Sequence, residues 1–193
     1  MAATPTILAF AGSTREGSFN KRLVKIAVAG ARTAGASVTE LDLRDLPLPL
    51  YDQDLETREG LPPNARKLKE LFLAHQGLLI SAPEYNSSIT GVLKNAIDWV
   101  SRSAPGEPPL ACFTGKTAVL MSASPGALGG LRGLVHVRAM LENIGVLVLP
   151  EQVAVPRAAE AFTSEGRLID AGRRAAVEQL GRRLTELLVK LHL

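Results

Sequence analysis

Short, almost continuously apolar runs alternate along this chain with longer segments of helical spacing, and this alternation restricts the possible folds more than any other feature. The apolar runs predict five buried strands: Thr6–Ala11, Ser37–Leu43, Gly77–Ala82, Lys116–Ala123 and Val146–Leu149. The helical spacing predicts five helices: Ser18–Ala34, Asn64–Ala74, Thr90–Ser103, Leu131–Ile144 and Ile169–Leu191. Strands that are apolar on both faces must be covered on both faces, so the pattern favours a parallel sheet between two layers of helices.

Five strand–helix units in 193 residues suit an α/β fold of the flavodoxin-like type. This is a three-layer sandwich whose five-stranded parallel sheet has the order 2-1-3-4-5, and an eight-stranded barrel would need more units. We expect a single domain over residues 1–193, with Gly145 ending the fourth helix and Pro150 ending the last strand. The proline-rich stretch Leu48–Pro63 is predicted to be a loop, either a flap over a binding site or a long connection.

Charge and composition argue against several classes of protein. The net charge is only +3, aromatic residues make up 4%, and acidic residues are interspersed with the basic ones, so no nucleic-acid-binding surface is expected. Cys112 is the only cysteine, which excludes an internal disulfide and fits a reducing compartment. Residues 1–11 do not resemble a signal peptide, and no apolar run approaches the ~20 residues of a membrane helix, so we expect a cytoplasmic protein without membrane contact.

Ligands of such sheets bind beyond the carboxyl ends of the strands, which directs attention to three loops. The first, Gly12–Asn20, carries several hydroxyls and Arg15, and it leads into a helix whose unpaired N–H groups favour an anion. It lacks the GxGxxG and GxxxxGK[ST] patterns, so a terminal phosphate monoester suits it better than a pyrophosphate. The alternative is that Ser18 only caps the helix and Arg15 is only solvated.

The other two loops supply groups suited to a flat heterocycle. In Pro83–Ile89, Tyr85 can lie against a ring and backbone N–H groups can meet its edge, although Asn86 and Ser88 also suit a turn and a helix N-cap. In Ser124–Gly130 the glycines permit close approach of the backbone to a ligand.

Three segments resemble signature segments of the NADPH-dependent FMN reductase family, which includes bacterial quinone, chromate and azo-dye reductases. They are GSTREGSFNKRL (12–23), PEYNSSITGVLKNAIDW (83–99) and SPGALGG (124–130), and the resemblance covers about residues 6–150. It implies a flavodoxin-like fold, bound FMN, NADPH or NADH as electron donor, and a homodimer or homotetramer in which the second subunit helps to form the pocket.

Carried over by position, the resemblance assigns the FMN phosphate to Ser13, Arg15, Ser18, Phe19 and Asn20. It assigns the isoalloxazine ring to Pro83, Glu84, Tyr85 and Asn86, and the other side of the pocket to Ser124, Gly126 and Gly129.

The function implied is an FMN-dependent NAD(P)H oxidoreductase that passes electrons to quinones, flavins or similar acceptors in a two-step, ping-pong hydride cycle. The flavin N5 carries the hydride, so no catalytic side chain and no metal are expected, although Tyr85 should lie near the ring. His75, His136 and His192 are far apart in the sequence and are expected to be structural or solvated. The alternatives are a flavodoxin-type electron carrier, which is usually acidic, and a phosphate-binding module without flavin. Trp99 can fill the core or form an interface.

Overall fold

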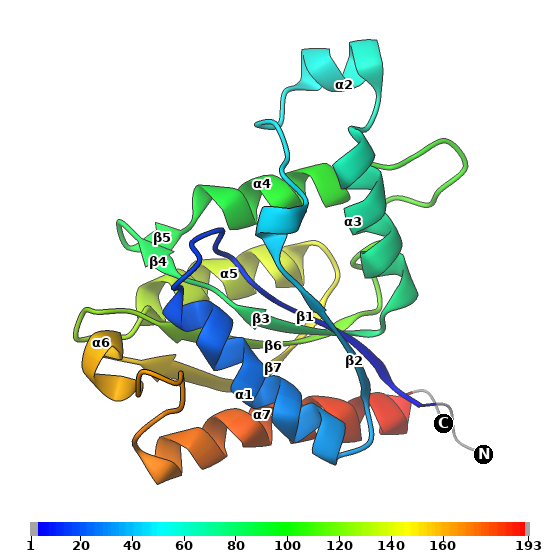
Figure 1. The fold of residues 1–193 in the computed structure, drawn as a ribbon. Coiled ribbons are helices and arrows are strands. Elements are labelled where there is room, and N and C mark those ends of the chain that lie inside the picture. Colours follow the sequence, from blue (N-terminus) through cyan, green and yellow to red (C-terminus); the bar gives the residue numbers. More distant parts are fainter. Residues whose placement is uncertain (1–3, 192–193) are drawn as a thin grey trace.

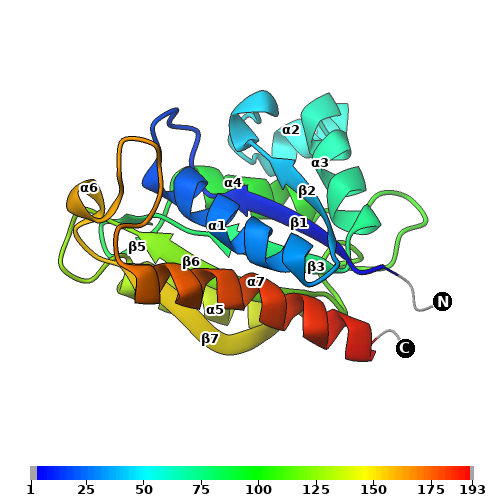
Figure 2. The same cartoon turned by 60° about the horizontal axis from the view of Figure 1, so that its bottom comes forward.

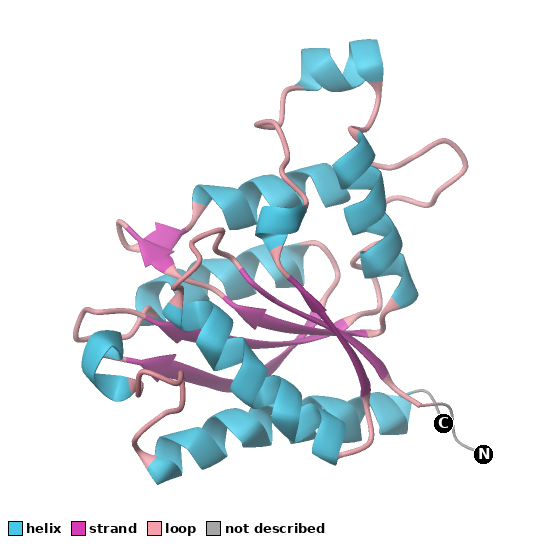
Figure 3. Cartoon of the chain, in the orientation of Figure 1, coloured by secondary structure: helices cyan, strands magenta, loops and turns pink. Residues whose placement is uncertain are grey.

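The five apolar segments form one parallel sheet in the computed structural model, which describes residues 4–191 (Figures 1 and 3). The strands are β1 (Thr6–Ala11), β2 (Ser37–Leu41), β3 (Gly77–Ser81), β6 (Thr117–Ala123) and β7 (Leu147–Val155). They are arranged in the order β2-β1-β3-β6-β7, and every neighbouring pair is parallel. The flavodoxin-like order 2-1-3-4-5 expected from the sequence is therefore confirmed.

Each face of the sheet has its own hydrophobic core because successive side chains of a strand point to opposite faces. In β1, Ile7 and Ala9 pack with α1 and α7, whereas Leu8 and Phe10 pack on the opposite side. The helices of the first face are α1 (Phe19–Thr33) and α7 (Ala171–Leu191), which lie side by side in Figure 2. Those of the second face are α3 (Pro63–Ala74), α4 (Gly91–Val100) and α5 (Leu131–Asn143).

Two glycines allow α1 and α7 to approach closely. A Cβ on Gly30 would lie 1.9 Å from the carbonyl oxygen of Glu178, and one on Gly181 would lie 2.0 Å from that of Ala27. Neither position can carry a side chain without separating the helices. The close contact fixes α1, whose N-terminal end borders the first loop.

Several boundaries differ from the sequence prediction. The last strand was expected to end at Pro150, but β7 continues to Val155, with a shift of register opposite Ala118 and Leu120. Because β7 is an edge strand, the missing N–H of Pro150 is tolerated there, and the bulge takes up the irregularity. The second strand ends at Leu41, before a 3-10 turn over Leu43–Asp45.

Two short helices and two short strands were not predicted. Helix α2 (Gln53–Glu59) interrupts the proline-rich loop and is capped by Asp52, whose carboxylate accepts hydrogen bonds from two N–H groups. Strands β4 (Glu84–Tyr85) and β5 (Ser88–Ile89) form a hairpin, and α6 (Ala158–Ala161) follows β7. The predicted helices over Thr90–Ser103 and Ile169–Leu191 are shorter, with α4 ending at Val100 and α7 beginning at Ala171.

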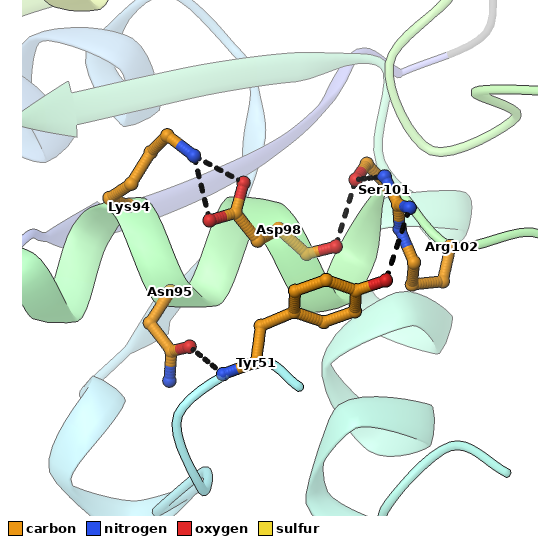
Figure 4. Close-up of polar contacts among 6 residues, drawn as sticks. All are labelled: Tyr51, Lys94, Asn95, Asp98, Ser101 and Arg102. Carbon is orange, nitrogen blue, oxygen red and sulfur yellow. Dashed lines mark hydrogen bonds and ion pairs between the residues drawn. The ribbon is translucent and has the colours of Figure 1, made fainter. Parts of the chain in front are cut away.

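The segment Pro47–Tyr51 docks on α4 through backbone groups. The carbonyl oxygen of Pro49 accepts hydrogen bonds from Asn95 Nδ2 and Trp99 Nε1, each at 2.8 Å. The Tyr51 N–H donates to Asn95 Oδ1 at 2.8 Å, and the Tyr51 ring lies beside the Arg102 guanidinium (Figure 4). Trp99 is fully buried, so of the two roles considered for it the structure supports the core role. This part of the proline-rich stretch is a docked connection, and α2 projects beyond it (Figure 1).

Candidate functional site

The three loops predicted to bind a ligand meet at the carboxyl edge of the sheet and enclose a cavity of about 280 Å³. Nine of the twelve predicted site residues line it: Ser13, Arg15, Ser18, Phe19, Asn20, Pro83, Glu84, Tyr85 and Ser124. Ala123 and Pro125, which were not predicted, complete the lining. Asn86, Gly126 and Gly129 are not among the lining residues.

The first loop is fixed at both ends and leaves polar groups directed to the cavity. Gly12 donates its N–H to the Ser81 carbonyl at 2.9 Å and accepts the Thr90 hydroxyl at 2.7 Å. Ser18 occupies the N-cap position of α1 and is only 3% exposed, but its side chain makes no capping hydrogen bond. The alternative in which Ser18 serves only as a helix cap is therefore not supported. Its hydroxyl and the first N–H groups of α1 remain available to an anion.

Arg15 provides the positive charge of this loop. It forms no ion pair within residues 4–191, and its guanidinium carbon lies 5.5 Å from the centroid of the Phe19 ring. Its backbone N–H donates to Ser13 Oγ at 3.3 Å, which orients that hydroxyl within the loop. A guanidinium without a carboxylate partner at the mouth of a cavity suits a phosphate dianion.

Asn20 joins α1 to two strands. Its Oδ1 accepts hydrogen bonds from Ser81 Oγ and the Ala123 N–H, and its Nδ2 donates to the Ala123 carbonyl at 2.8 Å. The amide group is buried, and both its oxygen and its nitrogen take part in these bonds. Asn20 thus borders the cavity while holding the first loop against β3 and β6.

The second loop forms the hairpin β4–β5, and Glu84 anchors it to α5. The carboxylate accepts two hydrogen bonds from Arg132, at 3.0 and 2.6 Å, and one from the Gly133 N–H at 3.1 Å. Burial alone would raise the pKa of Glu84, but the Gly133 N–H and the Arg132 guanidinium outweigh it and hold the pKa below its usual value. Glu84 is therefore an anionic cap on the N-terminal turn of α5.

The tip of the hairpin, Asn86 and Ser87, does not line the cavity. Asn86 and Ser87 both have positive φ, at 50° and 65°, as the central residues of a type I′ turn require. Tyr85 lines the cavity but remains 57% exposed. The sequence suggested that Asn86 and Ser88 serve as turn and N-cap residues, and Asn86 does lie in the turn. The N-cap of α4 is Thr90, which accepts the Leu93 N–H, and Ser88 instead contacts His136 Nδ1 at 2.9 Å.

The glycines of the third loop serve its packing against the end of β7. Gly129 has a φ of 64°, and a Cβ there would lie 2.6 Å from the carbonyl carbon of Val155. The Gly126 carbonyl accepts the Arg157 N–H at 3.2 Å. Both residues shape the loop from outside the cavity, whereas Ser124 lines it.

Cys112 and His75, two other titratable candidates, are not among the residues that line this cavity. Cys112 is buried, and burial raises the pKa of its thiol. His75 bridges the Leu71 carbonyl and Thr39 Oγ1, and His192 lies outside the described residues. Between residues 4 and 191 no group of three or more His, Cys, Asp or Glu side chains is placed to hold a metal. Over the same range, no helix has both the length and the apolar character required to cross a membrane.

Comparison with known proteins identifies relatives over most of the chain. A family model described as NADPH-dependent FMN reductase matches residues 5–160. An NAD(P)H-dependent FMN reductase of Pseudomonas aeruginosa is 37% identical over 174 residues, which cover 90% of this chain and 89% of that protein. A quinone reductase of Escherichia coli K12 is 35% identical, with 86% of each chain covered.

Solved structures agree with the fold. A flavoenzyme NAD(P)H:(acceptor) oxidoreductase from Paracoccus denitrificans superposes with a TM-score of 0.80 at 26% identity, covering 98% of this chain and 99% of that one. An archaeal flavodoxin, at 11% identity and a TM-score of 0.63, covers 95% of this chain and 98% of its own, which supports the flavodoxin-like fold alone.

Proposed function

The chain belongs to the NADPH-dependent FMN reductase family and is an FMN-dependent NAD(P)H oxidoreductase, and we propose that the cavity between its three loops is where FMN binds. The observation that carries this proposal is the first loop. It combines a buried Ser18 hydroxyl without a capping bond, the free N–H groups of α1, and Arg15 without an ion pair in the described chain. These groups suit a phosphate dianion, and an absent GxGxxG pattern makes a dinucleotide a poorer fit.

We assign the phosphate to Ser13, Arg15 and Ser18, with Phe19 and Asn20 shaping the loop around it. Asn20 acts through its hydrogen bonds to β3 and β6, which hold the loop at the sheet edge. Pro83, Glu84 and Tyr85 border the cavity on the side of the hairpin, and Ser124 borders it on the side of the third loop, so these residues are proposed to flank the ring. Asn86, Gly126 and Gly129 are proposed to act through the shape of their loops.

When bound, FMN supplies the two-electron chemistry, and the residues of this chain bind it, orient it and control access. Glu84 is the only carboxylate among the described residues that line the cavity, and it is held by Arg132 and the Gly133 N–H. We propose that the reaction uses no catalytic side chain, because the flavin itself carries the electrons. Donor and acceptor are proposed to use the opening beside Tyr85 in turn, which would give ping-pong kinetics.

The acceptor is proposed to be a quinone or a similar small electron acceptor. Relatives are named quinone reductase and NADPH:quinone oxidoreductase, and these names motivate the proposal. The runner-up is a flavodoxin-type electron carrier, which shares the fold but would not oxidise NAD(P)H. The positive net charge of the chain disfavours it, since such carriers are usually acidic.

We further propose that the protein forms a homodimer, or a homotetramer built from it. Four large apolar side chains are exposed on the hairpin, the third loop and α5, which contact one another next to the cavity: Tyr85, Leu128, Leu131 and Val135. Exposed apolar side chains gathered in this way are typical of an interface, and one beside the cavity would let a second copy help to enclose it. The single buried thiol suits a reducing environment, and we propose a cytoplasmic location.

The test is the absorption spectrum of the purified full-length protein, followed by steady-state kinetics. We expect a bound-flavin spectrum, oxidation of NADPH or NADH that depends on an added quinone, and parallel double-reciprocal lines. A protein that binds FMN but does not oxidise either nicotinamide would support the carrier instead. A colourless protein that takes up no FMN would contradict the assignment of the cavity.

A further inference from the structure

A segment outside the three signature loops joins two of them. Residues Arg157–Leu168, which we call the brace, begin after β7 and include α6. The Ala158 N–H donates to the Ser124 carbonyl at 3.0 Å, and the Arg157 N–H donates to the Gly126 carbonyl at 3.2 Å. The Phe162 ring stacks on the Phe19 ring, with centroids 5.8 Å apart and planes at 19°. The brace thus holds the third loop through its backbone and the first loop through one aromatic side chain, beside the start of α1 (Figure 2).

The brace is itself firmly attached to the core. Phe162 is only 6% exposed and pairs with Leu168 in an antiparallel bridge, and both pack in the core formed with α1 and α7. The turn between them is closed by a hydrogen bond of 2.9 Å from the Thr163 N–H to the Arg167 carbonyl. At Gly166, where φ is 82°, a Cβ would lie 3.3 Å from Cδ of Arg22, so the turn runs close to that side chain. Phe162 therefore presents a fixed surface to Phe19.

Phe19 in turn lies close to two arginines, of which Arg15 belongs to the proposed phosphate site and Arg22 does not line the cavity. The guanidinium carbon of Arg15 lies 5.5 Å from its ring centroid, and that of Arg22 lies 5.7 Å away. A cation close to an aromatic ring is attracted to it, and this attraction limits the freedom of an exposed arginine. A site whose cation is already oriented loses less entropy when its ligand binds.

We propose that Phe162 is a positioning residue for the FMN phosphate: it fixes the Phe19 ring, and through that ring it holds Arg15 in place at the mouth of the cavity. The inference rests on the proposed FMN site. It adds a contribution from a region that the signature loops do not include, and that lies largely beyond the matched residues 5–160. Phe162 does not line the cavity, so its effect on the phosphate must pass through Phe19.

The test compares FMN with riboflavin, which has the same ring and ribityl chain but no phosphate. The full-length protein, freed of flavin, is titrated with each, and the ratio of the two affinities isolates the phosphate. Phe162→Leu keeps an apolar side chain and removes the ring; we expect FMN affinity to fall about fivefold and riboflavin affinity to stay within twofold. The matched control is Phe113→Leu. It removes another fully buried ring, stacked edge-on against Phe72 at 5.4 Å on the opposite face of the sheet, and should leave the ratio unchanged.

A double variant tests the path through Arg15. If Phe162 acts through that guanidinium, Phe162→Leu should change FMN affinity little once Arg15→Ala is present. Equal losses for FMN and riboflavin, an unchanged ratio, or full additivity with Arg15→Ala would overturn the inference. If Phe162→Leu does not fold, Phe162→Met serves in its place. A wild-type protein that binds FMN no better than riboflavin would instead contradict the phosphate site itself.

Discussion

The loop Gly12–Asn20 and the segment Pro47–Tyr51 are both connections that lie against α4, yet they differ in the polar groups between their fixed ends. In Pro47–Tyr51, the Pro49 carbonyl has two donors and the Tyr51 N–H has an acceptor, all from α4 side chains. In Gly12–Asn20, the Ser18 hydroxyl makes no capping bond, and Arg15 has no ion pair in the part of the chain that the structure describes.

The difference separates a structural connection from a binding loop. A buried polar group that is already paired stabilises the fold and has little left to offer a ligand. A polar group left without a partner in a folded chain costs stability unless something else satisfies it, and a phosphate at the start of α1 would do so. The two regions should therefore respond differently to substitution, one in folding and the other in flavin affinity.

The largest effect is expected at the docked segment. Trp99→Ala removes a fully buried indole and its hydrogen bond to the Pro49 carbonyl, and should lower the free energy of unfolding by about 3–5 kcal/mol. Chemical denaturation of the flavin-free protein measures this. The ratio of FMN to riboflavin affinity of the folded variant should be unchanged. If Trp99→Ala lowered the ratio of FMN to riboflavin affinity as much as Arg15→Ala does, the two regions would not differ in function.

Arg15→Ala tests the binding loop with the opposite expectation. A charged hydrogen-bonding partner of the phosphate contributes about 1.5–3 kcal/mol, so FMN affinity should fall roughly 10- to 100-fold. Because Arg15 is exposed, the free energy of unfolding without flavin should change by less than about 0.5 kcal/mol. Arg58→Ala is the matched control, since it removes an exposed arginine from α2, beyond the docked segment. Unchanged FMN affinity in Arg15→Ala would contradict its assignment.

Glu84→Gln tests an intermediate case, a cavity residue whose polar atoms are paired. In the folded wild-type protein the pKa of Glu84 lies below its ordinary value of 4.5. The carboxylate therefore stabilises the fold fully above pH 4.5, and this stabilisation is lost as the pH falls from 4.5 through the lowered pKa. Losing the charge should cost about 1–3 kcal/mol at pH 7. The stability difference between wild type and variant should shrink below about pH 4.5. A difference that stays constant from pH 7 to pH 3 would show that the charge does not matter.

The sequence predicted the features that depend on local spacing. Strand positions follow from apolar runs, and the meeting of the three loops follows from their place at one edge of a parallel sheet. The individual site residues came from the family resemblance, and nine of the twelve line the cavity. What it could not give are contacts between distant residues. Asn20 donates a hydrogen bond to Ala123, 103 positions away in the sequence, and together with its bond to Ser81 we call this contact the Asn20 clamp. No local sequence pattern distinguishes an asparagine in this structural role from one that binds a phosphate. The stacking of Phe162 on Phe19 is hidden for the same reason. The continuation of β7 past Pro150 depends on its place at the sheet edge, which spacing does not reveal.

The smallest effect is expected at two buried serines, Ser81 on β3 and Ser122 on β6. They allow the same comparison, between a paired and an unpaired polar group, for a single hydroxyl. Ser122 Oγ has no hydrogen-bond partner among the described residues, whereas Ser81 Oγ donates to Asn20 at 2.9 Å. Removing an unsatisfied buried hydroxyl relieves a desolvation cost, so Ser122→Ala should be neutral or raise the free energy of unfolding by up to about 1 kcal/mol. Ser81→Ala should lower it by about 1 kcal/mol, because it removes a hydrogen bond from the Asn20 clamp. Thermal denaturation of both variants in parallel checks the signs. If Ser122→Ala destabilised the protein as much as Ser81→Ala, the Ser122 hydroxyl would have a partner after all, and a missing partner within the chain would no longer mark a polar group as available.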